Sequence, residues 1–163
     1  MAQDNQEQEV KFYLADRAAL EARLRAAGAR LKQPRVFESN LRFDRPDGSL
    51  ARQRQVLRLR QDERVRMTFK GPAAAGKEVS DRTEIEFEAS SFANARALLE
   101  ALGYRVSVMY EKYRASYELD GCEVTLDELP YADFAEIEGP GAEAIQAVAG
   151  QLGLDWSTRS LDS

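Results

Sequence analysis

The chain contains no histidine, only one cysteine and no long apolar segment. Without an imidazole it cannot assemble a Ser-His or Cys-His triad, so proton transfer near neutral pH would fall to carboxylates, a perturbed lysine or metal-bound water. The single cysteine, Cys122, excludes an intramolecular disulfide and a thiolate metal cluster, and it is typical of a reducing cytosol. A metal site would therefore use oxygen ligands, which favour hard cations such as Mg²⁺ or Mn²⁺ over zinc.

No apolar run approaches the roughly 20 residues of a membrane span. The first residues, MAQDNQEQ, are polar and acidic rather than signal-like. We therefore expect a cytoplasmic protein with no membrane partner. Charged residues make up 31% of the chain but the net charge is only -5, so the overall balance gives no support for a nucleic-acid partner. A chain of 163 residues without a low-complexity linker predicts one domain spanning residues 1–163.

Three segments carry a helical period of apolar residues and end in glycine, at Gly28, Gly103 and Gly153. Asp16 is the expected N-terminal cap of the first helix, and Ser90 or Ser91 of the second. A Glu-x-Glu pair lies a few residues before each helix; the pairs are Glu7 and Glu9, Glu84 and Glu86, and Glu136 and Glu138. This recurrence indicates three units, each a strand followed by a helix, whose strands belong to one sheet.

The remaining pattern is an alternation of apolar and charged residues, which predicts strands with one apolar face and one charged face. These strands are expected at residues 7–12, 36–43, 57–60, 64–70, 83–87, 110–119, 123–127 and 135–138. An open sheet with its charged face in water would explain any single strand. Like charges paired along a strand are costly unless they are neutralised, so the whole set favours a closed sheet with the charges facing a hydrated interior.

Such an interior would contain many charges of both signs. The acids are Glu7, Glu9, Glu84, Glu86, Asp127, Glu136 and Glu138, and the bases are Lys11, Arg58, Arg60, Lys70, Lys112 and Arg114. Even one unpaired ion in a dry interior costs several kcal/mol, so the space would have to hold water, metal ions and a polyanion. Arginine and lysine bind phosphate oxygens and carboxylates bind Mg²⁺ or Mn²⁺, so a linear triphosphate with a divalent metal matches this inventory best.

Seven short motifs occur in a characteristic order: EQEVK at the start, LRLR, TFKGP, RTEIE, YEKYR, TLDELP and FAEIEG. With these motifs the sequence resembles the CYTH domain, or triphosphate tunnel metalloenzyme superfamily, over nearly its whole length. The resemblance implies an α+β fold in which a closed eight-stranded antiparallel β-barrel forms a triphosphate tunnel, with helices packed outside. The superfamily includes class IV adenylyl cyclases, thiamine triphosphatases and inorganic tripolyphosphatases.

The resemblance also implies roles for individual residues. The metal-ligand candidates are Glu7, Glu9, Asp127, Glu136 and Glu138, with Glu84 and Glu86 serving a second ion or its waters. The phosphate-binding candidates are Lys11, Arg58, Arg60, Lys70, Lys112 and Arg114. Glu9, Lys11 and Lys70 are the expected catalytic residues. Arg66 and Arg82 are expected at a tunnel mouth or on the surface, and Tyr110, Tyr113, Tyr117 and Trp156 are expected to pack.

The expected function is therefore divalent-metal-dependent hydrolysis of a linear triphosphate, either inorganic tripolyphosphate or an organic triphosphate such as thiamine triphosphate or a nucleotide. A class IV adenylyl cyclase that converts ATP to cyclic AMP and pyrophosphate is the alternative. We place hydrolysis first because it needs no base-recognition pocket, and the sequence reveals none. Two other functions stay open, which are a binding module without turnover and a purely structural barrel. A homodimer is a possible quaternary state.

Overall fold

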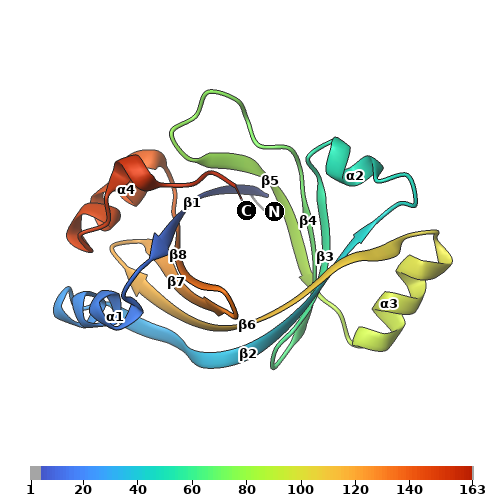
Figure 1. Ribbon diagram of the computed structural model, residues 1–163, viewed down its shortest axis with the longest axis horizontal. Coiled ribbons are helices and arrows are strands. Elements are labelled where there is room, and N and C mark those ends of the chain that lie inside the picture. Colours follow the sequence, from blue (N-terminus) through green and yellow to red (C-terminus); the bar gives the residue numbers. More distant parts are fainter. Residues whose placement is uncertain (1–4, 163) are drawn as a thin grey trace. The chain divides into compact units, whose positions relative to one another are not determined.

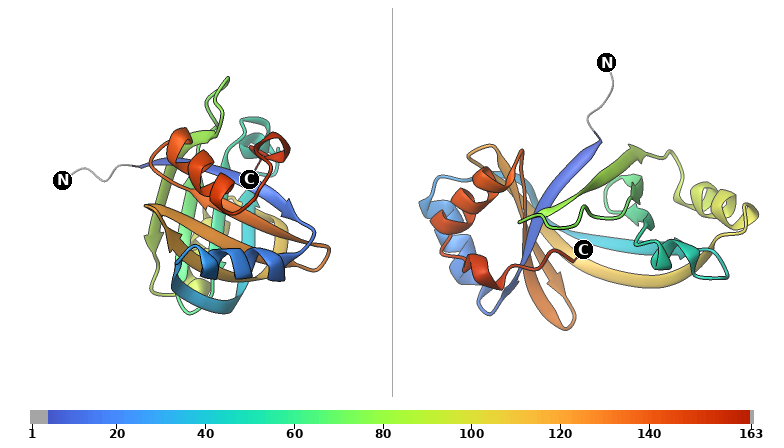
Figure 2. Two further views of the ribbon diagram at one scale, coloured as in Figure 1. Left: turned by 90° about the vertical axis from the view of Figure 1, so that its left-hand side faces the viewer. Right: turned by 90° about the horizontal axis from the view of Figure 1, so that it is seen from above.

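The structure is a computed structural model that describes residues 5–162 (Figures 1 and 2). Four α-helices, eight strands and one short 3-10 helix lie in this part of the chain. In chain order the elements are β1 (Gln6–Leu14), α1 (Arg17–Ala26), β2 (Arg30–Asp44), α2 (Ser49–Arg52), β3 (Val56–Gln61), β4 (Val65–Lys70), β5 (Ser80–Glu88), α3 (Phe92–Ala101), β6 (Arg105–Leu119), β7 (Cys122–Leu129), β8 (Ala132–Glu138), α4 (Ala142–Gln151) and η1 (Trp156–Thr158).

The eight strands form one antiparallel sheet that closes on itself, in the order β1-β5-β4-β3-β2-β6-β7-β8. Consecutive strands pair along much of this order, as in β3 with β4, β4 with β5, β6 with β7 and β7 with β8. The strands β1 and β8 also pair, although they lie at opposite ends of the chain. This architecture confirms the predicted α+β fold with a closed eight-stranded antiparallel sheet and helices packed outside.

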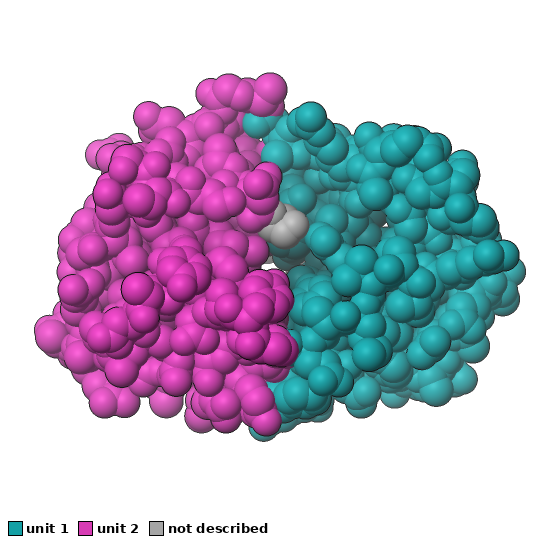
Figure 3. Space-filling model, viewed as in Figure 1, with its two compact units in different colours: residues 1–6, 37–74, 82–111 teal, residues 7–36, 75–81, 112–163 magenta. Residues whose placement is uncertain are grey.

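The described chain forms two compact units, coloured separately in Figure 3. Unit 1 comprises residues 5–6, 37–74 and 82–111, and unit 2 comprises residues 7–36, 75–81 and 112–162. Neither unit is continuous in sequence, and β2 and β6 each contribute residues to both. The interpretation of the chain as a single domain stays a prediction.

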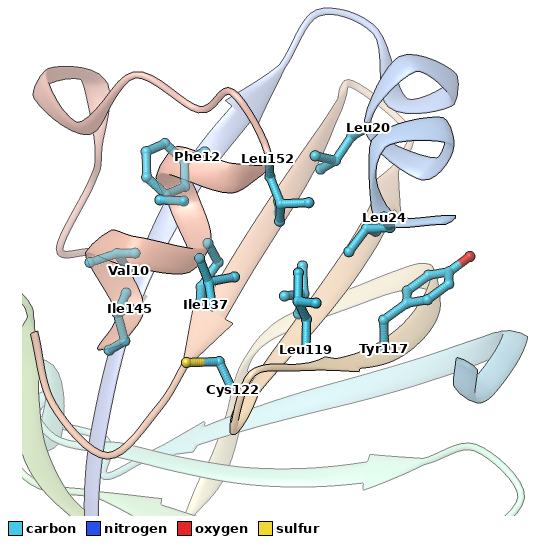
Figure 4. Close-up of a cluster of buried hydrophobic side chains, with 14 of the residues drawn as sticks. Val10, Phe12, Leu20, Leu24, Tyr117, Leu119, Cys122, Ile137, Ile145 and Leu152 are labelled. Atoms are coloured by element: carbon cyan, nitrogen blue, oxygen red, sulfur yellow. The ribbon is translucent and has the colours of Figure 1, made fainter. Parts of the chain in front are cut away.

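Unit 2 has the larger hydrophobic core, which lies between its strands and the helices α1 and α4 (Figure 4). Alternate residues of the strands supply it, including Val10, Phe12 and Ile137, all at most 1% exposed. Leu24 of α1 and Ile145 of α4 are fully buried against them. Cys122 belongs to the same core, and burial raises the pKa of its thiol, with the charge of Asp120 adding to the effect, so this cysteine is a packing residue.

Unit 1 has a separate core beneath α3. Leu41, Phe43 and Leu59 come from the strands and Leu99 comes from the helix, and each is at most 8% exposed. The expected cap of this helix is confirmed, since the Ser91 hydroxyl oxygen accepts a hydrogen bond from the Asn94 amide at 3.1 Å. Asp16 likewise caps α1, as predicted, by accepting from the Ala19 amide at 3.0 Å.

The strands β2 and β6 are much longer than the alternation predicted, with 15 residues each. The first part of β2 contains Pro34 and several charges, which do not resemble a strand locally. In unit 2 this part is held by ion pairs to β6 and β7, from Arg30 to Glu118, from Lys32 to Glu123 and from Arg35 to Glu128. Within residues 5–162, the structure contains no helix with the length and apolar character needed to cross a membrane.

Candidate active site

In unit 1 the sheet register brings charged and polar side chains onto one face. Arg58 of β3 lies opposite Arg42 of β2 and opposite Thr68 of β4, and Thr68 lies opposite Glu86 of β5. Residues directly opposite each other in an antiparallel pair share a face of the sheet. The next residues on these strands, such as Leu41 and Leu59, turn to the other face and pack in the core under α3.

The Arg60 guanidinium is the centre of a buried network on this face. Its nitrogens lie 3.5 Å from a Glu38 carboxylate oxygen and 3.3 Å from a Glu86 carboxylate oxygen. Asn40 donates a hydrogen bond to Glu38 at 2.9 Å, and the Thr68 hydroxyl donates to Glu86 at 2.7 Å. Because Glu38, Asn40 and Thr68 are at most 1% exposed, the orientation of the guanidinium is tightly defined.

Further cations surround this network. Lys70, which is 7% exposed, has its ammonium nitrogen 3.2 Å from a Glu84 carboxylate oxygen. Burial lowers the pKa of Arg42, the Tyr110 phenol opposes this shift, and the positive charges of Arg58 and Arg82 lower the pKa further. The Glu38, Glu84 and Glu86 carboxylates lie on the same face, so this face of unit 1 carries charges of both signs.

Unit 2 carries a second network, in which cations and anions alternate. The Asp127 carboxylate, in a residue only 2% exposed, accepts hydrogen bonds from Lys112 at 2.8 Å and from two Arg114 nitrogens at 2.6 Å. Arg114 also donates to Glu136 at 2.7 Å, and the Lys11 ammonium lies 3.2 Å from the other oxygen of Glu136. These residues form a continuous chain of ion pairs across β6, β7, β8 and β1.

Carboxylates also face each other on neighbouring strands of unit 2. Glu9 of β1 lies opposite Glu138 of β8, and Glu7 and Glu9 are only 5% and 7% exposed. Like charges directly opposite in a sheet are destabilising unless a cation lies near them.

The type of donor in this unit fits a divalent cation, since carboxylate oxygens are the ligands that Mg²⁺ and Mn²⁺ prefer. Within residues 5–162, however, no three Asp, Glu or Cys side chains are gathered around a common point that could hold a metal ion. Carboxylates such as Asp127 and Glu136 are instead held by lysine and arginine. Metal binding would therefore require some of these carboxylates to turn away from their basic partners.

The structure places the predicted site residues in two groups. Unit 1 contains Arg58, Arg60, Lys70, Glu84 and Glu86, and unit 2 contains Glu7, Glu9, Lys11, Lys112, Arg114, Asp127, Glu136 and Glu138. The assembly of both groups around one tunnel stays a prediction, as do their individual roles. Arg82 was expected at a tunnel mouth or on the surface, but it is only 7% exposed, so it is not a surface residue.

Sequence reasoning missed three members of the unit 1 network, Glu38, Asn40 and Thr68. Their alternation with apolar neighbours was visible, and it placed all three on the charged faces of their strands. Nothing in the sequence indicated that Glu38 contacts Arg60, because the two residues meet only through the pairing of β2 with β3.

The fold and site together are a closed eight-stranded antiparallel sheet with basic and acidic side chains interleaved along its strands. The sequence model of the CYTH domain matches residues 5–152, so the chain belongs to the CYTH domain family. No curated protein matches the chain in sequence.

Solved structures support the same fold. A proposed adenylate cyclase from Vibrio parahaemolyticus is 23% identical, with 99% of this chain and 96% of that chain covered and a TM-score of 0.87. The PH1012 protein from Pyrococcus horikoshii is 24% identical, with 96% of each chain covered and a TM-score of 0.82. A proposed adenylyl cyclase from Hippeastrum, described as having a dominant triphosphatase activity, is 20% identical, with coverage of 91% and 88% and a TM-score of 0.68.

Proposed function

We propose that this protein is a divalent-metal-dependent phosphohydrolase that cleaves a linear triphosphate. The observation that carries the proposal is the pairing of buried or half-buried cations with buried or half-buried carboxylates on the strands of both units, in a chain of the CYTH family. A triphosphate with its counter-cations is the small ligand that matches both kinds of group.

The basic residues would bind the phosphate oxygens. These residues are Arg58, Arg60 and Lys70 in unit 1, and Lys11, Lys112 and Arg114 in unit 2. Arginine presents a planar fork that matches a phosphate with two parallel hydrogen bonds. Because Glu38 and Glu86 already hold the Arg60 guanidinium in place, little reorganisation would be needed as charge grows on the phosphate in the transition state.

The carboxylates would hold Mg²⁺ or Mn²⁺. The proposed ligands are Glu7, Glu9, Asp127, Glu136 and Glu138, with Glu84 and Glu86 at a second ion or its waters. The chemistry supplied by such an ion is neutralisation of phosphate charge and acidification of a water molecule. Glu9, Lys11 and Lys70 are the residues that we expect to contact the reacting groups.

The ion pairs imply that the two ligands assist each other. Arg114 donates hydrogen bonds to both Asp127 and Glu136, so a bound polyanion would compete with these carboxylates for Arg114, and a bound divalent cation would compete with Arg114 for the carboxylates. Each ligand therefore releases the groups that the other one needs, and linkage requires the effect to be reciprocal. Triphosphate should bind more tightly when the metal is present.

The direct test offers tripolyphosphate, thiamine triphosphate and ATP with Mg²⁺ and with Mn²⁺. Orthophosphate, pyrophosphate and cyclic AMP are then measured separately. Release of orthophosphate supports the hydrolase, and its absence with every substrate and metal contradicts the proposal.

We expect Glu9→Gln and Lys70→Ala each to lower turnover by at least about tenfold, equivalent to about 1.4 kcal/mol in the barrier. Glu9→Gln removes a negative charge from the proposed metal site, and Lys70→Ala removes a positive charge from the proposed phosphate site. Cys122→Ser is the matched control, because Cys122 lies in the hydrophobic core and should leave kcat largely unchanged. Full activity in Glu9→Gln would show that its carboxylate is not a metal ligand.

The second candidate is a class IV adenylyl cyclase, which the description of the Vibrio parahaemolyticus structure favours. In that reaction the ribose 3′-hydroxyl attacks the α-phosphorus of ATP and pyrophosphate leaves. The same set of basic and acidic residues would serve it. Cyclic AMP together with pyrophosphate, in place of orthophosphate, would identify this activity.

A further inference from the structure

Three aromatic side chains of unit 2 form a cluster that the sequence did not indicate. Tyr13 of β1 lies directly opposite Phe134 of β8, and Tyr131 lies in the turn before β8. The Tyr13 and Phe134 ring centroids are 6.1 Å apart and the rings meet edge to face at 79°. Tyr131 contacts Phe134 in a similar way, at 6.3 Å and 70°. We call these three residues the aromatic cluster.

The aromatic cluster lies on the charged face of the sheet and not on the core face. Along β1, Phe12 and Leu14 are buried in the core, whereas Tyr13 shares the opposite face with Glu9 and Lys11. Tyr13 is 67% exposed and Tyr131 is 77% exposed. Edge-to-face packing against Phe134 leaves ring surface of both tyrosines open to a ligand.

The aromatic cluster is continuous with the proposed phosphate site. The Lys11 ammonium lies 5.8 Å from the centroid of the Phe134 ring and 3.2 Å from a Glu136 carboxylate oxygen. Tyr13 is two residues beyond Lys11 on the same face, which corresponds to roughly 7 Å along a strand. A molecule with a phosphate near Lys11 would therefore have its next group beside Tyr13.

We propose that the aromatic cluster binds the flat heteroaromatic group of an organic triphosphate whose phosphates contact Lys11 and Arg114. This inference rests on the proposed function and specifies its substrate class. Stacking on tyrosine accepts many heterocycles, because every such ring has a π face. A nucleoside triphosphate and thiamine triphosphate share this chemistry, and a positively charged ring gains an additional attraction to the tyrosine faces. Inorganic tripolyphosphate has no group to place there.

The test compares the affinities of ATP, thiamine triphosphate and tripolyphosphate by isothermal titration calorimetry, with EDTA and with Mg²⁺. We expect Tyr13→Ala to weaken binding of at least one organic triphosphate about tenfold and to change tripolyphosphate affinity less than twofold. Tyr13→Phe, which keeps the ring, should restore the affinity. Tyr131→Ala provides an independent variant in the turn. Phe87→Ala is the matched control, because it removes a ring that is 59% exposed from β5 in unit 1.

The possible results separate this inference from the proposed function. Suppose that tripolyphosphate binds the wild type, and that neither Tyr13→Ala nor Tyr131→Ala weakens binding of an organic triphosphate more than binding of tripolyphosphate. The aromatic inference is then wrong and the hydrolase proposal stands. If no triphosphate binds in either buffer, both are wrong. A larger loss for thiamine triphosphate than for ATP supports a cationic ring as the ligand, and the reverse supports a nucleobase.

Discussion

Several carboxylates in the two networks contact more than one positively charged side chain. Asp127 contacts Lys112 and Arg114, and Glu136 contacts Arg114 and Lys11. These shared contacts offset the cost of removing the charged groups from water. Removing one partner of a buried ion pair typically lowers the free energy of unfolding by about 3–5 kcal/mol. Exposed pairs such as Lys32 with Glu123 are worth about 1 kcal/mol or less because water and salt screen them.

This contrast between buried and exposed ion pairs predicts that two substitutions on β7 differ in their effect on stability. Asp127→Asn should lower the free energy of unfolding by about 3 kcal/mol, because it removes the negative charge that two largely buried cations contact. Glu123→Gln also removes a carboxylate charge from β7, but it should cost less than about 1 kcal/mol. Urea denaturation of both variants measures the difference. Equal costs would show that burial of the Asp127 network contributes nothing to stability.

At the scale of elements, the junction between β8 and α4 depends on a close approach that only glycine permits. A Cβ atom at Gly139 would lie 2.7 Å from the Cys122 sulfur and 3.1 Å from a side-chain carbon of Ile145. Both neighbours belong to the hydrophobic core of unit 2. The packing of α4 onto the strands therefore leaves no space for a methyl group at this position.

We expect Gly139→Ala to lower the free energy of unfolding by about 1–3 kcal/mol through overpacking. Adding Cys122→Ala should recover part of this loss, because it removes the sulfur that the new methyl group would meet. Gly150→Ala is the control, since its Cβ would meet no atom within 4 Å and alanine at this exposed position of α4 should not lower stability. Thermal and urea denaturation of the wild type, Gly139→Ala, Cys122→Ala and the double variant would measure the coupling, and strictly additive costs would contradict the proposed contact.

At the scale of the whole molecule, ligand binding should stabilise the folded state. Tripolyphosphate with Mg²⁺ at about 100 times its dissociation constant should add about 2.7 kcal/mol. For a chain of this size each kcal/mol corresponds to roughly 2–4 °C, so the melting temperature should rise by about 5–10 °C. Orthophosphate with Mg²⁺ is the control and should give a smaller shift. A melting temperature unchanged by tripolyphosphate, thiamine triphosphate and ATP, with Mg²⁺ and with Mn²⁺, would contradict both an enzyme and a binding module for triphosphate.

Much of the fold was predictable because it depends on neighbours in sequence. The period of two along β1 places Val10 and Phe12 in the core and Lys11 on the charged face, as the structure confirms. The cap of α1 at Asp16 depends on residues three positions apart, and it too was predicted. The length of β2 was not, because its first part is held by ion pairs to residues more than 80 positions away.

The sequence by itself therefore determined which side of each strand is charged and where α1 and α3 begin, since backbone geometry and capping act over a few residues. Only the tertiary structure decided which charges meet, as when Glu38 contacts Arg60 and when Tyr13 lies against Phe134. The reason is that these contacts follow from strand pairing between distant segments. The register of such a pairing is set by the packing of the whole sheet and its helices and not by any local pattern.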